Sequence, residues 1–310
     1  MIHNVRTSNG DSKGTFKATD AFGGSGQESG GSPPLCHSQL VVMVATMEQL
    51  TPGQFIQDPR GAIILLQHVI NWVDDTVNKE ILHRDEDMQV QLHRIRKILL
   101  HWRRILRITG GDLELSKTVV YYLNHIQEED GKMRFKTIQE TPGDIIMPAE
   151  TESEKDIKID RNESDKAERY LGVRIALSGQ MVTELNFRCK HSKDLSVKLG
   201  QIYMTCPAAT LAYQSRWLSI VGFFTTITCF TQNQCEGIHT PIYQVFLPKM
   251  GHNRNLPLAI RYEPKRYGGA NLTHTYTEQV IKHIQFVVGT ARHSSELSNM
   301  QLIALSTIQI

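Results

Sequence analysis

The stretch INWVDDTVN, residues 70–78, sets two adjacent carboxylates, Asp74 and Asp75, directly behind a run of apolar residues. Neighbouring side chains on a flat strand point to opposite faces, so these two converge only where the backbone turns, as it does at a hairpin tip. Like charges raise each other's pKa, and divalent cations relieve that repulsion. The pair is therefore either an ordinary polar turn or a site for metal ions.

Magnesium is the ion that suits such a pair. It binds a few carboxylate oxygens, keeps several waters and leaves positions for substrate phosphates. Two ions roughly 4 Å apart activate an attacking hydroxyl and stabilise the leaving oxygen of an in-line phosphoryl displacement. The metal hypothesis thus implies phosphoryl-transfer chemistry.

The segments before the acidic pair predict a loop, an apolar element and a strand. GGSGQESGGSPP (23–34) is a glycine-serine loop that ends in two prolines, and LVVMVATMEQL (40–50) is interpreted as an apolar helix or a buried strand. AIILLQHVINWV (62–73) is rich in β-branched residues and predicts a strand that delivers the acidic pair to its end.

The segment after the pair predicts an amphipathic helix that ends at Gly110 and Gly111. Its apolar residues recur at steps of three and four: Leu92, Ile95, Leu99, Trp102 and Leu106. Its opposite face is basic, with Arg94, Arg96, Lys97, Arg103, Arg104 and Arg107. That face is interpreted as either solvated or phosphate-facing.

The remaining chain predicts three regions. GGDLELSKTVVYYL (110–123) is a turn entering a strand, with Lys117 continuing the alternation of Leu113 and Leu115. Residues 140–167 are polar and acidic, which predicts a linker or loop between residues 1–139 and 168–310. RYLGVRIAL (169–177) restarts an apolar strand, and the pattern is mostly helical from Thr183 onward.

Charge and cysteine usage restrict the class of protein. Residues 168–310 carry 14 Lys/Arg against 7 Asp/Glu, a net charge of +7, while residues 1–167 carry 20 against 25. A basic half suits a polyanionic partner. The five scattered cysteines indicate reduced thiols, and no secretory signal or membrane span is recognised. We expect an intracellular protein of nucleus or cytoplasm, not secreted, without a membrane or disulfide-linked partner.

Several segments in this order resemble the reverse transcriptases of non-LTR (LINE-like) retrotransposons, and the resemblance covers nearly the whole chain. The segments are FGGSGQESGGSPP (22–34), INWVDDT (70–76), TGGDLELSK (109–117), RYLGVRIALSG (169–179), LAYQSRWLSIVGF (211–223), FLPKMGHNRNLPLAI (246–260) and PKRYGGANL (264–272).

The resemblance implies an α+β fold: a partial right-hand polymerase palm, with a small antiparallel sheet and helices, followed by a mainly helical thumb. It implies two-metal nucleotidyl transfer with Mg²⁺ held by Asp74 and Asp75, and Lys117 near the pyrophosphate leaving group. Partners would be an RNA template, an RNA/DNA hybrid and deoxynucleotides. The loop against template and nucleotide would contain Gln27, Ser29, Gly30 and Ser32.

The sequence also departs from the family pattern. A further catalytic aspartate is expected from an earlier strand, but Asp11 and Asp20 are too close to the glycine loop to be assigned that role, and Glu28 stands where the family loop has glycine. We therefore expect an N-terminally incomplete reverse transcriptase that is inactive by itself. The alternatives are a non-catalytic nucleic-acid-binding remnant, favoured by the basic half, and a product that does not fold.

Overall fold

The computed structural model describes residues 6–7, 10–11, 32–51, 53–67, 69–72, 75–79, 86–108, 111–149, 155–293 and 295–308. The chain forms two compact units. The first unit comprises Met1–Ile56, Leu66–Tyr122 and Lys136–Asn162, and the second comprises Gln57–Leu65, Leu123–Phe135 and Glu163–Ile310. Helices combine with small, separate sheets, which confirms the α+β class; the palm and thumb assignment stays a prediction.

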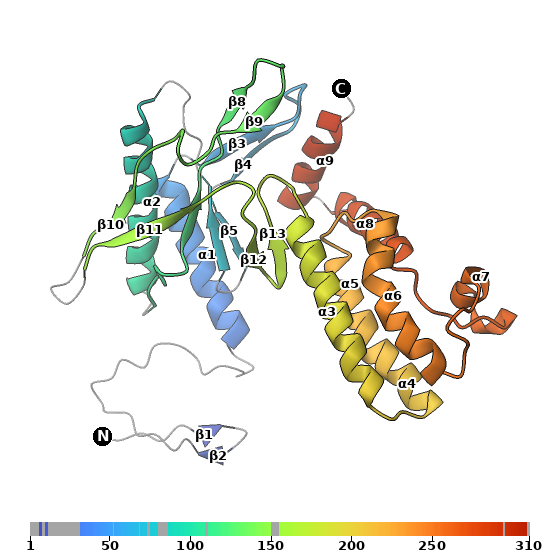
Figure 1. Ribbon diagram of the computed structural model, residues 1–310. Helices are drawn as coiled ribbons and strands as arrows, with labels where there is room; N and C mark the ends of the chain where they lie inside the picture. Colours follow the sequence, from blue (N-terminus) through green and yellow to red (C-terminus); the bar gives the residue numbers. More distant parts are fainter. Residues whose placement is uncertain are drawn as a thin grey trace. The chain divides into compact units, whose positions relative to one another are not determined.

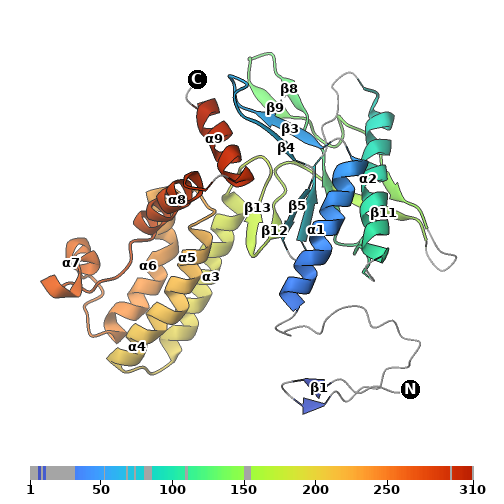
Figure 2. The same cartoon turned by 180° about the vertical axis from the view of Figure 1, so that it is seen from behind.

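Two long helices of the first unit, α1 (Ser32–Leu50) and α2 (Met88–Ile108), lie side by side in both views (Figures 1 and 2). Met43 and Met47 of α1 share an apolar cluster with Trp102 of α2. Residues 40–50 thus belong to a helix, one of the two predicted alternatives. The helix predicted from the apolar spacing between Leu92 and Leu106 is confirmed.

A three-stranded sheet lies against the same helix α2. It has the order β10-β11-β7, with β10 (Ile145–Met147) antiparallel and β7 (Val119–Tyr121) parallel to β11 (Ile157–Asn162). The linker or loop predicted over residues 140–167 therefore contains two of the three strands of a sheet.

The linker prediction was wrong because only alternate positions of this region are buried. Ile145, Met147 and Ile159 are at most 1% exposed and pack with Leu92 and Leu99 of α2. In β11 the charged residues Lys158 and Asp160 lie on either side of the buried Ile159, and they lower the mean hydropathy of the segment. A strand with one buried face needs only every second residue to be apolar.

The strand predicted over residues 62–73 is divided between two ribbons. β4 (Ile64–Gln67) pairs with β3 (Gln54–Gln57), and β5 (Val69–Trp72) pairs with β6 (Asp75–Asn78). Two further ribbons are short: β1 (Arg6–Thr7) with β2 (Gly10–Asp11), and β8 (His125–Gln127) with β9 (Met133–Phe135).

The second unit contains a tight hairpin, β12 (Glu168–Tyr170) with β13 (Val173–Ile175). Its two linking residues, Leu171 and Gly172, have φ of 49° and 86°. Positive φ at both positions is the type I′ pattern that matches the twist of an antiparallel pair. The single strand predicted for residues 169–177 is therefore wrong, because the chain reverses at Leu171.

Helices make up the rest of the second unit and surround one apolar core. The successive elements are α3 (Val182–Gln201), α4 (Cys206–Ala212), the π-helical turn η1 (Tyr213–Trp217), α5 (Leu218–Phe224), α6 (Gln232–Lys249), α7 (Leu258–Tyr262), the 3₁₀ turn η2 (Lys265–Tyr267), α8 (Thr275–Ala291) and α9 (Glu296–Ile308). Trp217, Phe224 and Phe246 are at most 1% exposed within this core. The helical pattern predicted from Thr183 onward is confirmed.

Helices α3 and α6 form the main packing pair of the second unit, and both views show them side by side (Figures 1 and 2). Helix α6 begins with a capping box, in which Thr231 and Gln234 satisfy each other's backbone amides. This cap fixes the start of α6.

The sequence predicted reduced thiols and no membrane span. The four cysteines with described side chains, Cys189, Cys206, Cys229 and Cys235, are free thiols. Within the ranges that the structure describes, no helix combines the length and hydrophobicity that a bilayer crossing requires.

Candidate functional site

The acidic pair lies at the turn of a hairpin. Strands β5 and β6 are antiparallel, and their register pairs Trp72 with Asp75 and Asn71 with Thr76. Because Trp72 and Asp75 face each other, only two residues, Val73 and Asp74, join the strands. Asp75 is the first residue of β6, so it lies directly after the turn. The two carboxylates can converge only at such a reversal of the backbone.

Val73 and Asp74 lie outside the described residues, and only the backbone of Asp75 is described. The hairpin is thus observed, while the convergence of the two carboxylates stays a prediction.

The glycine-rich loop is placed only by its end. Gln27, Ser29 and Gly30 lie outside the described residues, and Ser32 is the first residue of α1, with its side chain not described. Helix α1, which follows this loop directly, contacts β5 of the acidic hairpin. The element that continues from the loop therefore packs on the hairpin.

Lys117 lies in a turn and not on the strand that the sequence predicted. Its amide donates to the carbonyl of Glu114 at 3.0 Å, the amide of Thr118 donates to the same carbonyl at 3.1 Å, and β7 begins only at Val119. Leu115 is buried and anchors the turn, whereas Lys117 is exposed. The alternation of Leu113 and Leu115 resembled a strand but serves a turn.

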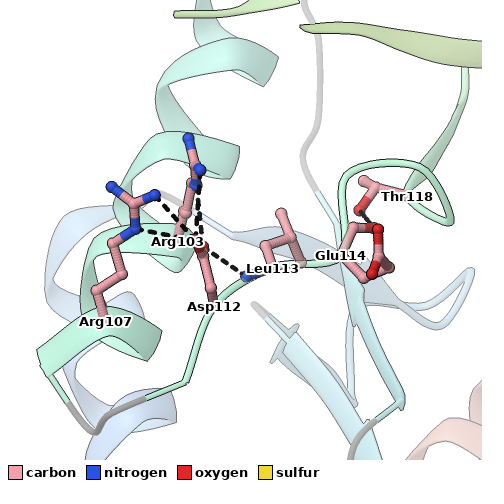
Figure 3. A network of polar contacts seen from close by, with 6 residues as sticks. All are labelled: Arg103, Arg107, Asp112, Leu113, Glu114 and Thr118. Atoms are coloured by element: carbon pink, nitrogen blue, oxygen red, sulfur yellow. Dashed lines mark hydrogen bonds and ion pairs between the residues drawn. The ribbon is translucent and has the colours of Figure 1, made fainter. Parts of the chain in front are cut away.

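An ion-pair network that the sequence did not reveal holds the start of this segment (Figure 3). Arg103 Nε lies 3.0 Å from Asp112 Oδ1, and Arg107 Nη2 lies 2.9 Å from Oδ2. Burial by itself raises the pKa of Asp112, but the hydrogen bonds from Arg107 and Arg103 outweigh it and hold that pKa well below its ordinary value. A charged Asp112 thus ties the segment leading to Lys117 to the end of α2.

Part of the basic face of α2 differs from both of its interpretations, whereas Lys97 and Arg104 on the same helix are exposed. Arg103 is 5% exposed, so it is not solvated, and it pairs with Asp112 together with Arg107. Arg94 pairs with Glu86 at 2.5 Å. Arg94, Arg103 and Arg107 therefore neutralise carboxylates of their own unit. The i, i+4 spacing puts Arg103 and Arg107 on one face of the helix, but nothing in the sequence placed Asp112 beside them.

Replacing Asp112 by asparagine tests this network. The guanidinium of the buried Arg103 would lose its anionic partner, so the free energy of unfolding should fall by about 1–2 kcal/mol, a value discounted for the exposure of Asp112. Urea unfolding measures the change. Asp130→Asn is the matched control, because that carboxylate pairs with the exposed Lys132 at 2.7 Å. Equal losses in the two variants would contradict the assigned role.

The described side chains form no metal centre of their own. Among them, no group of three or more His, Cys, Asp or Glu side chains is placed to hold an ion. Asp74 and the side chain of Asp75 lie outside the described part of the chain. The Mg²⁺ prediction therefore rests on the hairpin register and on the chemistry of adjacent carboxylates.

Comparisons of the chain with protein-family models, with curated proteins and with solved structures find no match.

Proposed function

We propose that the first unit carries the metal-binding hairpin of an RNA-directed DNA polymerase, a reverse transcriptase of the non-LTR retrotransposon type. The observation that carries the proposal is the Trp72–Asp75 register, which leaves two residues to join β5 and β6 and sets the acidic pair at the turn. The order of elements agrees with it: loop, α1, acidic hairpin, α2, lysine turn and β7.

The proposed chemistry is nucleotidyl transfer with two Mg²⁺ ions. Carboxylate oxygens of Asp74 and Asp75 would hold the ions, which activate the primer hydroxyl and stabilise the leaving oxygen. Lys117 is exposed, and its backbone is fixed by the Glu114 turn, so its ammonium is available to neutralise charge on the pyrophosphate. Substrates would be deoxynucleotides on an RNA template.

The second unit is the proposed thumb, which would hold the RNA/DNA hybrid. Its support is the helical architecture from α3 onward and the net charge of +7 over residues 168–310. Binding of this kind depends on salt and is indifferent to sequence. Because the third catalytic carboxylate is unassigned, a hybrid-binding protein without polymerase activity is the second candidate function, favoured by the same charge.

Manganese binding tests the acidic hairpin. Mn²⁺ serves as a paramagnetic stand-in for Mg²⁺, and the free ion is counted by electron paramagnetic resonance in the presence of an RNA/DNA hybrid. Asp74→Asn with Asp75→Asn should weaken binding about tenfold or more, because both ligand carboxylates are lost.

The chain offers a matched control for this double variant. Glu128 and Glu129 are also adjacent acids, and they follow β8 in another hairpin, where both are exposed. Glu128→Gln with Glu129→Gln should leave Mn²⁺ binding unchanged. Equal Mn²⁺ affinity in the wild type and in the Asp74/Asp75 variant would refute the metal hairpin.

Primer extension separates the two candidate functions. For the chain by itself, we expect incorporation no higher than that of the Asp74→Ala, Asp75→Ala variant, together with hybrid binding that weakens as salt increases. Incorporation above the variant would instead establish polymerase activity. Hybrid affinity that is unchanged between low and high salt would exclude nucleic-acid binding through the basic half.

A further inference from the structure

A cationic pocket lies in the second unit and is lined by none of the residues assigned to the metal hairpin. It is lined by Thr240, Tyr243 and Gln244 of α6, by Arg254 and Asn255, and by Arg261 of α7. Its volume is about 350 Å³, at the lower end of the range for small-ligand pockets. Its lining contains the guanidinium groups of Arg254 and Arg261, the side-chain amides of Gln244 and Asn255, and no carboxylate.

The two arginines are not neutralised by described residues. Within the described part of the chain, the side chain of Arg254 makes no ion pair or hydrogen bond, and Arg261 makes no ion pair. Arg254 is exposed, whereas Arg261 is partly buried. Two uncompensated cations at one concave surface give a local positive potential that attracts anions.

Arg261 is already held in a defined position. Its Nη2 donates to the carbonyl of Leu256 at 3.1 Å, and its guanidinium carbon lies 5.8 Å from the centroid of the Tyr243 ring. Its Nε–H is buried and has no acceptor. A guanidinium that is fixed in place loses less rotamer entropy when it binds an anion, and its fork of N–H groups matches phosphate oxygens.

Neutral donors complete the lining. Asn255 and Gln244 carry amide N–H groups, and Thr240 carries a hydroxyl, although that hydroxyl donates to the carbonyl of Glu236 at 2.7 Å. Asn255 is set by its own turn, in which its backbone amide donates to Asn253 Oδ1 at 2.8 Å. Two cations with flanking amides form a donor set suited to a tetrahedral oxyanion.

We propose that this pocket binds a phosphate group through Arg254, Arg261 and Asn255. The phosphate is supplied either by free inorganic phosphate or by the backbone of a nucleic-acid duplex, and the same donors serve both sources. The site does not use Asp74, Asp75 or Lys117. A result that refutes the metal hairpin would therefore leave the phosphate proposal unchanged.

The test adds one carboxylate to the lining without changing its shape. Asn255→Asp places an anion next to Arg254 and Arg261, which should reduce phosphate affinity about tenfold or more. Asn253→Asp is the control, because it makes the same charge change two residues away at a side chain outside the lining and keeps the Oδ1 acceptor of the turn. Binding is measured with inorganic phosphate by isothermal titration calorimetry.

Arg254→Ala provides a second variant that does not threaten folding, since the side chain is exposed and unpaired among the described residues. It should weaken phosphate binding, whereas Arg292→Ala, which removes an exposed arginine at the end of α8, should not. Circular dichroism of each variant verifies that the helices are intact. If wild-type protein shows no saturable phosphate binding, or if Asn255→Asp and Arg254→Ala bind as the wild type does, the pocket is not a phosphate site.

Competition identifies the source of the phosphate. A short RNA/DNA hybrid is bound in increasing inorganic phosphate at constant ionic strength. Displacement of the hybrid from the wild type, but not from Asn255→Asp, would show that the pocket holds a backbone phosphate. Binding of inorganic phosphate without displacement would assign the pocket to free phosphate. The Asp74/Asp75 variant should behave as the wild type does in both arms.

Discussion

Replacing Arg188 by alanine is expected to reduce the free energy of unfolding of the second unit by about 3–5 kcal/mol, the range for breaking a buried ion pair at one partner. Its partner Glu184 is 0% exposed, and Arg188 Nε lies 2.5 Å from Glu184 Oε1. Without Arg188, a carboxylate would stay buried with most of its compensating charge removed. Urea unfolding followed by far-UV circular dichroism measures the loss.

The network reaches beyond one helix, which is why the expected effect is large. Glu184 Oε2 accepts the backbone amide of Arg174 at 2.8 Å, and Arg188 Nη2 donates to the carbonyl of Gly172 at 3.0 Å. Both contacts join α3 to the tight β12–β13 hairpin. The alanine variant therefore loses the attachment of the hairpin as well as the ion pair.

Two control variants separate the network from helix propensity. Lys190→Ala removes an exposed cation of the same helix and should change stability by less than about 0.5 kcal/mol. Replacing the pair together, with Glu184→Leu and Arg188→Met, should cost less than Arg188→Ala because no charge stays buried unpaired. If Arg188→Ala is no worse than Lys190→Ala, Glu184 is not dependent on this partner.

This network also shows where sequence-based prediction ended. Glu184 and Arg188 are four residues apart on a helix, a spacing that indicates an exposed pair of small effect. Their burial depends on the reversal at Leu171 and Gly172, and no local pattern in residues 169–177 predicted that reversal. The Glu184–Arg188 pair is buried because the β12–β13 hairpin packs on it, and that hairpin lies earlier in the chain than α3.

Elements with a strong local period were predicted well. Helix α2 followed from the spacing of Leu92, Leu99 and Trp102, and the turn at the acidic pair followed from two like charges placed after an apolar run. Strand β11 was missed because its exposed face is polar, and β10 was missed because only three residues form it, although all three are apolar. Their burial is decided by packing on α2, which is a tertiary property.

For the candidate site, the sequence predicted the order of its segments along the chain but not the contacts between their side chains. The order of loop, acidic hairpin and lysine turn is a sequence property, and the hairpin register agrees with it. The Asp112 network was not predictable in the same way, because it depends on the path of the chain after α2. Arg103 was assigned to a solvent or phosphate face, but that path places Asp112 beside it.

Acidification is expected to destabilise the second unit through His239, and His239→Gln is expected to reduce that sensitivity. His239 is 2% exposed in α6, its ring stacks on Tyr243 at 4.7 Å between centroids, and its Nδ1 lies 3.2 Å from Thr275 Oγ1. Burial, followed by the charges of His274 and Arg261, lowers the pKa of His239 to about 4. The folded protein therefore keeps this ring neutral.

The direction of the pH effect follows from the lowered pKa. The ordinary histidine pKa is 6.5, so between that value and about 4 the unfolded chain binds a proton that the folded chain does not. Stability is complete above the unfolded pKa and is lost as the pH falls toward the folded pKa. The difference of the two pKa values corresponds to about 3 kcal/mol.

The groups around His239 give no compensation for a proton. Tyr243 and Tyr262 are phenols whose own pKa values are raised by burial, and His274 and Arg261 repel an imidazolium. The weak contact between Tyr262 Oη and His239 Nε2, at 3.5 Å, joins two neutral groups. Protonation therefore has no carboxylate partner within this cluster and requires the packing of α6 to open.

The measurement compares urea unfolding at neutral pH and at about pH 4 in the wild type, His239→Gln and His293→Gln. Other carboxylates titrate over the same interval, so the informative quantity is the difference between variants. His293 is exposed and provides the control for removing a histidine. His239→Gln should lose about 3 kcal/mol less than the wild type on acidification, and His293→Gln should lose as much as the wild type. Equal losses in all three proteins would show that His239 is not the group that links this core to pH.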